Sequence, residues 1–112
     1  MTKINSGSDF IMRIQFYDSD GAIIPIPIFD FKIEYFVKPD NTIMIEHTAG
    51  AYITDENTKV IVEGNTLTIS CDNIDFGVGK LRSRKTYYLP DERFVDGHRT
   101  LIEETTTEYT LI

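Results

Sequence analysis

The stretch Lys59-Val-Ile-Val-Glu-Gly-Asn-Thr-Leu-Thr-Ile-Ser70 is the clearest structural signal in this chain. Its apolar positions are mostly β-branched residues, which are enriched in strands because they pack well on a pleated surface. Gly64-Asn65 separates the two runs, and a two-residue connection of this kind suits a tight type II′ hairpin turn. The stretch therefore predicts a pair of antiparallel strands, and it carries no residue pattern typical of a catalytic site.

Alternating patterns extend the β prediction along the chain. One apolar face with period two is predicted over 9–17, formed by Phe10, Met12, Ile14 and Phe16. A second one-faced strand is predicted over 29–37, where only Phe36 interrupts the polar face. Further strands are expected around Ile43–His47, near Tyr52 inside a loop over 48–58, and over Lys80–Leu89 and His98–Leu111. No long window has the period of a helix.

These segments predict an all-β fold, an antiparallel sandwich of two sheets with seven to eight strands. A small barrel is the alternative architecture. We expect residues 1–112 to form a single domain, with the polar residues 1–8 as a flexible leader. Pro25 and Pro27 lack the N–H that a sheet ladder uses, so the segment 23–29 is expected at a sheet edge or crossing between sheets.

Composition excludes several classes of partner. The 112 residues include 18 acidic and 11 basic side chains, for a net charge of −7. Proteins that bind nucleic acids or anionic lipid need a cationic surface, so we expect no nucleic-acid and no membrane partner. The longest apolar stretch, Ala22–Phe29, contains two prolines and is far shorter than the ~20 residues that cross a bilayer. The first residues also lack the apolar run of a signal peptide.

The residues that usually carry chemistry are few and scattered. Cys71 is the only cysteine, so no intrachain disulfide forms, and it is expected to be a small buried hydrophobe. His47 and His98 are the only histidines, and no spacing typical of a zinc site surrounds them. We therefore expect a non-enzymatic protein with no catalytic residues, no metal and no cofactor.

One basic cluster interrupts this acidic chain. Lys80-Leu-Arg-Ser-Arg-Lys85 holds four of the 11 basic residues, and strand alternation places Lys80, Arg82, Arg84, Thr86 and Tyr88 on one face. The candidate interface comprises Lys80, Arg82, Arg84, Lys85, Tyr88, Glu103 and Glu104. In this hypothesis the basic strand meets the Glu103-Glu104 edge of a neighbouring copy, or an anionic glycan. The alternative is a solvated strand face paired with local acids.

Several short elements together resemble a known family. They are the strand 9–17 followed by Asp18-Ser-Asp-Gly21, the strand Phe29–Phe36, Gly79-Lys80-Leu81, Tyr88-Leu-Pro-Asp91 and Phe94-Val-Asp-Gly-His-Arg99. The pattern resembles the small Ig-like domains of phage and prophage virions, especially the N-terminal domain of baseplate upper proteins and tail-fibre relatives. Those proteins continue into a helical stalk, and these 112 residues contain no stalk sequence.

The resemblance implies an Ig-like sandwich that acts as a virion structural protein in the tail, baseplate or fibre. It implies assembly or attachment through other virion proteins or copies of the chain itself, as a homo-oligomer such as a trimer. The implied location is the virion, after synthesis in the bacterial host cytoplasm. The alternative function is a carbohydrate-binding or adhesion module, whose exposed aromatic rings would come from Tyr52, Tyr87, Tyr88 and Tyr109.

Overall fold

The computed structural model describes residues 2–5, 7–17, 20–24, 29–38, 42–72 and 77–112. Within these ranges the chain forms ten strands and no helix. The strands are β1 (Thr2–Ile4), β2 (Phe10–Tyr17), β3 (Ile23–Ile24), β4 (Asp30–Phe36), β5 (Thr42–Thr48), β6 (Ala51–Thr54), β7 (Thr58–Glu63), β8 (Thr66–Cys71), β9 (Gly79–Pro90) and β10 (His98–Leu111).

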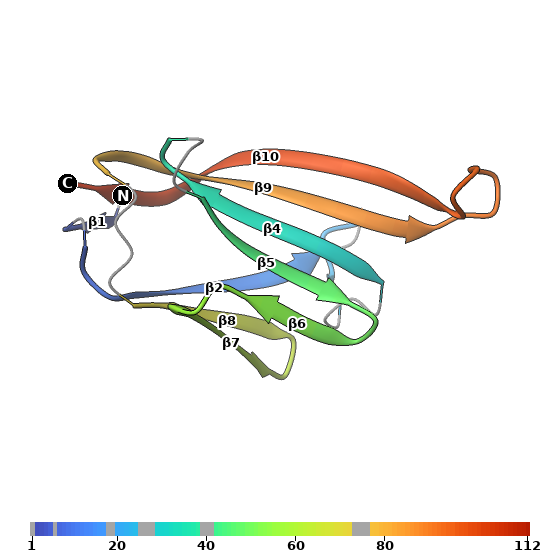
Figure 1. Ribbon diagram of the computed structural model, residues 1–112, viewed down its shortest axis with the longest axis horizontal. Coiled ribbons are helices and arrows are strands. Elements are labelled where there is room, and N and C mark those ends of the chain that lie inside the picture. The colour runs from blue at the N-terminus through green and yellow to red at the C-terminus, as the bar shows by residue number, and fades with distance from the viewer. Residues whose placement is uncertain (1, 6, 18–19, 25–28, 39–41, 73–76) are drawn as a thin grey trace.

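The strands form two sheets that face each other (Figure 1). The larger sheet has the order β1-β10-β9-β4-β5-β6, and the smaller has the order β3-β2-β8-β7. Every pair is antiparallel except β1 with β10. Strands β10, β9, β4, β5 and β6 take the G, F, C, C′ and C″ positions of a variable-type immunoglobulin sandwich, and β2, β8 and β7 take B, E and D. The predicted all-β, Ig-like sandwich is confirmed, with ten strands in the described ranges where seven to eight were expected.

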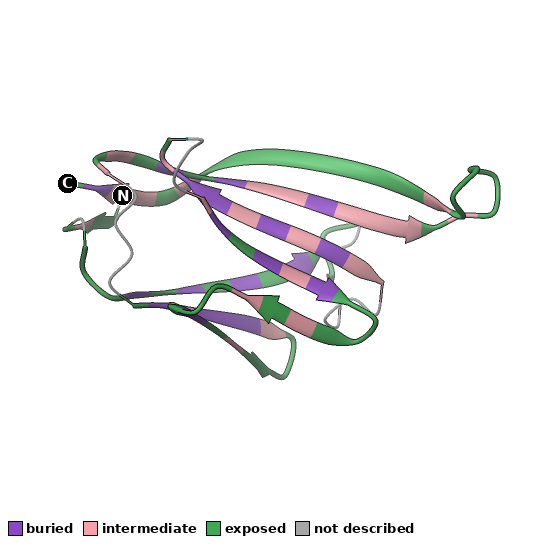
Figure 2. Ribbon diagram, in the orientation of Figure 1, coloured by how far each residue is buried: buried purple, intermediate pink, exposed green. Residues whose placement is uncertain are grey.

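The core lies between the sheets and follows the predicted alternation. Phe10, Met12, Ile14 and Phe16 of β2 are buried while their neighbours on β2 are exposed. Phe31, Ile33 and Tyr35 of β4 face them from the larger sheet. The rings of Phe16 and Phe31 meet edge to face, with centroids 5.4 Å apart. Figure 2 shows this alternation as bands of buried residues along β2, β4 and β5.

The Gly64-Asn65 hairpin forms as predicted. Val62 lies opposite Leu67 and Glu63 opposite Thr66, so the loop has two residues. Gly64 has a φ of 61°, whereas Asn65 is not among the residues with positive φ. A positive φ at the first loop position alone is the signature of the type II′ turn.

A second tight hairpin joins β5 to β6, where the sequence pattern predicted a loop. Thr48 lies opposite Ala51, so Ala49 and Gly50 alone form the turn. Their φ values of 53° and 82° correspond to a type I′ turn. Ala49 is the one described residue other than glycine with positive φ, and its N–H donates a 3.0 Å hydrogen bond to Asp30 Oδ1. Alanine gives no sequence signal for this turn, which is why the hairpin was missed.

The expected leader is partly a strand. Thr2–Ile4 run parallel to Tyr109–Leu111 at the edge of the larger sheet. Ile112 N–H donates to Ile4 O at 2.9 Å, and the Ile4 side chain packs against the core. Of the proline-containing segment, Ile23–Ile24 form the edge strand of the smaller sheet, as expected, while residues 25–28 lie outside the described ranges.

The strained turn residue gives a stability prediction. We expect Ala49→Asn to raise the free energy of unfolding by about 1 kcal/mol, because Asn tolerates the left-handed conformation that costs other residues ~1–2 kcal/mol. Thermal and urea unfolding measure the change. Ala51→Gly in the same hairpin is the control and should lower stability, because Ala51 has an ordinary strand conformation. No gain from Ala49→Asn would contradict the turn described here.

Candidate interaction surface

The β9–β10 hairpin is the longest element of the structure and reaches beyond the rest of the larger sheet (Figure 1). Its register is regular from Pro90 opposite His98 to Arg82 opposite Thr106. On its other side β9 pairs with β4, whose first residue, Asp30, lies opposite Tyr88. The end of β9, the connecting loop 91–97 and the start of β10 therefore project past β4. We call residues 91–97 the hairpin tip.

The outer edge of β10 is open over most of its length. Strand β1 covers only Tyr109–Leu111, and no other strand of the described ranges pairs with residues 98–106 on that side. Figure 2 shows this part of β10 as a continuous exposed band. We call His98–Thr106 the β10 edge. An unpaired strand edge presents a row of backbone N–H and C=O groups to which another strand can bond.

Internal hydrogen bonds hold the hairpin tip in shape. Asp91 N–H donates to Gly97 O at 2.9 Å, and Gly97 N–H donates to Phe94 O at 3.0 Å. The Asp91 carboxylate accepts from the Arg93 guanidinium at 2.7 and 2.9 Å and from the Arg93 N–H at 3.1 Å. Hydrogen bonds from Arg93, side chain first and then backbone, lower the pKa of Asp91. The tip is thus ordered in advance of any contact, which reduces the entropy lost on binding.

Four of the exposed large apolar side chains lie on this hairpin. Phe94 is half exposed and Val95 is fully exposed at the tip, while Leu101 and Ile102 are exposed on the β10 edge. Leu101 and Ile102 lie on opposite faces because they are consecutive in a strand. A set of large apolar side chains at a projecting end is typical of an interaction site. Sequence reasoning missed these residues, and the signal was a Phe-Val pair inside an otherwise polar loop.

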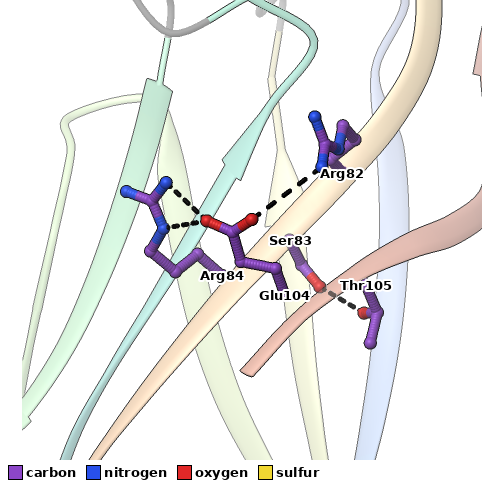
Figure 3. A network of polar contacts seen from close by, with 5 residues as sticks. All are labelled: Arg82, Ser83, Arg84, Glu104 and Thr105. Atoms are coloured by element: carbon purple, nitrogen blue, oxygen red, sulfur yellow. Dashed lines mark hydrogen bonds and ion pairs between the residues drawn. The ribbon is translucent and has the colours of Figure 1, made fainter. Parts of the chain in front are cut away.

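The outer face of the larger sheet carries an ion-pair cluster (Figure 3). Arg84 Nε donates to Glu104 Oε1 at 2.6 Å, and Arg82 approaches Glu104 Oε2 at 3.8 Å. Both guanidinium groups also lie over the Phe36 ring, 5.8 and 5.6 Å from its centroid. This cover explains why Phe36 is buried although it lies on the polar face of β4.

The seven candidate interface residues divide between two faces instead of forming one surface. Arg82, Arg84, Tyr88 and Glu104 lie on the outer face, whereas Lys85 lies opposite Glu103 on the inner face. Lys80 is exposed at the far end of the strand, opposite Thr110. Glu104 already has intrachain partners, so the alternative of a strand face paired with local acids describes Arg82, Arg84 and Glu104.

A cleft lined by both polar and apolar residues runs between β2 and the inner face of the β9–β10 hairpin. It consists of two hollows of about 580 and 350 Å³ that share Gln15, Tyr17 and Lys85. Tyr87 and Glu103 line the smaller hollow. Burial, and then the negative charge of Glu103, raise the pKa of Tyr87 to about 12, so its hydroxyl stays protonated and available as a donor.

The four tyrosines proposed as a glycan platform do not share a surface. Tyr88 contacts His98 on the outer face, while Tyr87 contacts Phe16 and Phe29 on the inner one. Tyr52 packs on Phe31 and His47 of the core, and Tyr109 packs near Phe10. Each ring is partly buried in a different place, so these four residues do not form a flat exposed stack.

The histidines and the cysteine have structural surroundings. His47 is buried, stacks on Phe31 with centroids 5.0 Å apart, and bonds through Nδ1 to Phe29 O at 3.1 Å. Cys71 is buried in the core, where desolvation, followed by the charge of Asp72, raises its pKa to about 12. A thiol with that pKa is a poor nucleophile at neutral pH. No group of three or more His, Cys, Asp or Glu in the described ranges is arranged to hold a metal ion.

Comparisons with protein-family models, curated proteins and solved structures find no match to this chain. None of the described residues belongs to a helix that is long and apolar enough to cross a membrane.

The ion-pair cluster gives a second prediction. Arg84 and Glu104 have side-chain exposures of 42% and 41%, so water and salt screen their attraction. A double-mutant cycle of Arg84→Ala and Glu104→Ala should give a coupling free energy of about 0.5–1 kcal/mol that falls by more than half in 1 M salt. Urea unfolding of the four variants measures it.

The matched control is the pair Lys32 and Glu34, whose charged atoms are 3.6 Å apart on neighbouring positions of β4. That pair makes one longer contact, whereas Arg84 brings two nitrogens to Glu104 Oε1, so Lys32 and Glu34 should couple more weakly. A coupling between Arg84 and Glu104 that is insensitive to salt would contradict the exposed geometry.

Proposed function

We propose that this chain is a non-enzymatic phage or prophage virion structural protein, a domain that assembles or attaches parts of the tail, baseplate or fibre. The observation that carries the proposal is the β9–β10 hairpin, which combines an open strand edge with exposed apolar residues at its tip. Both features suit binding to another protein chain. The resemblance of the sequence to Ig-like virion domains supports the same function.

The chemistry of the described residues fits a structural role better than a catalytic one. The strongest shifts of pKa are those of Tyr35, Tyr87 and Cys71, and burial is the largest cause of each. Burial that raises these pKa values keeps the groups neutral, whereas catalytic groups usually have a pKa near the working pH. The partners that we propose are other virion proteins or copies of this chain, in a particle assembled in the bacterial cytoplasm.

The hairpin tip is the site of attachment in this proposal. Replacing Phe94 and Val95 together by Ser should prevent incorporation of the chain into particles, because both apolar contacts are lost. Folding should be unaffected, since both side chains are exposed. The measurement is quantitative mass spectrometry of particles purified from cells that carry the phage or prophage genes flanking this one.

Val78→Ser is the control, because Val78 is exposed just before β9, at the end of the strand far from the tip. It should leave incorporation at the wild-type level. Absence of the wild-type chain from purified particles would refute the proposed function. Equal incorporation of the tip variant would refute the role of the tip.

A second candidate function is carbohydrate binding, which the cleft between β2 and the β9–β10 hairpin favours. Gln15, Tyr17 and Lys85 bring an amide, a phenol and an ammonium group to one hollow, and such groups can orient a sugar ring. A glycan array that gives a signal abolished by Lys85→Ala would support this alternative. An array without any signal would exclude it for the glycans present.

A further inference from the structure

The hydrogen bonds of the hairpin determine in which direction each residue of the β10 edge directs its backbone N–H and C=O groups. In an antiparallel ladder, opposite residues alternate between pairs that exchange hydrogen bonds and pairs that do not. Asp91 bonds to Gly97 across the end of the hairpin, and the register continues without interruption to Arg82 and Thr106. Every second pair from that bond, beginning with Leu89 and Arg99, therefore exchanges bonds within the hairpin.

This alternation determines which backbone N–H and C=O groups of β10 are available to a further strand. Arg99, Leu101 and Glu103 direct their N–H and C=O groups towards β9. The intervening residues Thr100, Ile102 and Glu104 direct theirs away from β9, to the open side of the β10 edge. Two of the common protections of a strand edge, lysine and proline, are absent from 98–106. The Glu104 carboxylate already bonds to Arg84 of its own chain, and Glu103 lies opposite Lys85 in the ladder.

We propose that the β10 edges of two copies of this chain pair antiparallel about a twofold axis at Leu101, which joins the two larger sheets into one. This proposal rests on the proposed function and names one partner for it, a second copy. An antiparallel pairing of identical edges is self-complementary and closes at two copies. It therefore predicts a dimer, in contrast to the trimer suggested by the family resemblance.

Charge selects this register. With the axis at Leu101, Arg99 lies opposite Glu103 of the second copy, twice by symmetry, and the two Leu101 side chains meet at the centre. Moving the axis to Thr100 places Arg99 opposite Leu101, and moving it to Ile102 places Arg99 opposite Thr105. Moving it to Glu103 sets the two Glu103 carboxylates against each other, which is destabilising. The Leu101 register is thus the one of these four that pairs the cation with a carboxylate.

The same register suits the backbone. Thr100 lies opposite Ile102 of the second copy, and both have outward N–H and C=O groups, so each of the two symmetric pairs exchanges two hydrogen bonds. Leu101 then faces its copy as a pair without hydrogen bonds. Opposite Cα atoms in such a pair are ~4.5 Å apart, close enough for a disulfide between two introduced cysteines.

The test is disulfide trapping at a single position. Leu101→Cys should form a covalent dimer under mild oxidation at tens of micromolar, measured by non-reducing electrophoresis and intact mass. Ile102→Cys is the control, because Ile102 lies opposite Thr100 and not opposite itself. Ile102 is 65% exposed and Leu101 43% exposed, so random collisions would favour the control. Cys71 is buried and should not contribute.

We expect the Leu101→Cys dimer to form several-fold faster than the Ile102→Cys dimer. Equal or reversed rates would overturn the proposed pairing. A charge swap provides an independent variant. Arg99→Glu should convert the dimer to monomer in light scattering, and adding Glu103→Arg should restore it, with circular dichroism confirming that each variant is folded. Failure of the swap to restore the dimer would also overturn the register.

These outcomes are distinct from those for the proposed function. A wild-type chain that is strictly monomeric at hundreds of micromolar would refute the pairing. If that monomeric chain were still present in purified particles, the virion role would be supported, through a different partner. Conversely, dimers that trap at Leu101 with no chain in any particle would retain the pairing and refute the virion role.

Discussion

The edge-to-face contact between Phe16 and Phe31 is the interaction on which the rest of the structure depends. Phe16 lies near the end of β2 in the smaller sheet and Phe31 near the start of β4 in the larger, so the contact joins the two layers directly. Immunoglobulin domains usually connect these layers through a disulfide packed on a tryptophan. This chain has one cysteine and no tryptophan. Burial of aromatic and aliphatic side chains must therefore hold the sheets together by itself.

This core also explains why the β9–β10 hairpin can extend so far. Leu81 and Leu111 anchor the hairpin in the core at one end, where both are fully buried. The opposite end contributes exposed residues and adds little to the core. The body of the sandwich therefore tolerates a projecting hairpin whose stability comes from its own ladder and from β4. Because only one end of the hairpin is buried in the core, the tip and the β10 edge remain free for contacts with other chains.

Much of the fold could be predicted from the sequence because its strands are long and one-faced. The faces of β2 and β4, the Gly64-Asn65 turn and the bounds of β10 are local properties of the pattern. The pairing of β1 with the C-terminal strand could not be predicted, because three residues carry no period and their partner is distant in sequence. The turn at Ala49 was hidden because alanine is rare in that conformation.

The arrangement of the candidate interface residues depends on more than the residue pattern. Strand alternation correctly placed Arg84 and Lys85 on opposite faces of the sheet. The residue of β10 that lies opposite each of them depends on the register between β9 and β10. That register follows from the seven-residue tip (91–97), whose hydrogen bonds involve the backbone and are invisible in a residue pattern. Of the two alternatives that the sequence left open for Glu104, a neighbouring copy or a partner on its own chain, the structure shows the bond to Arg84 of its own chain. The exposed apolar residues of the hairpin could not be identified from the pattern, because a residue pattern does not show which apolar side chains remain exposed at a projecting end.

The central claim is that the outward backbone groups of the β10 edge are a binding element. Residue-resolved amide hydrogen exchange by NMR, measured over a range of protein concentrations, tests it most directly. The amides of Thr100 and Ile102 should exchange quickly in dilute solution and become protected as the protein concentration rises. The amides of Leu101 and Glu103 should be protected throughout by their bonds to β9. Exchange at Thr100 and Ile102 that does not change with concentration would contradict the account.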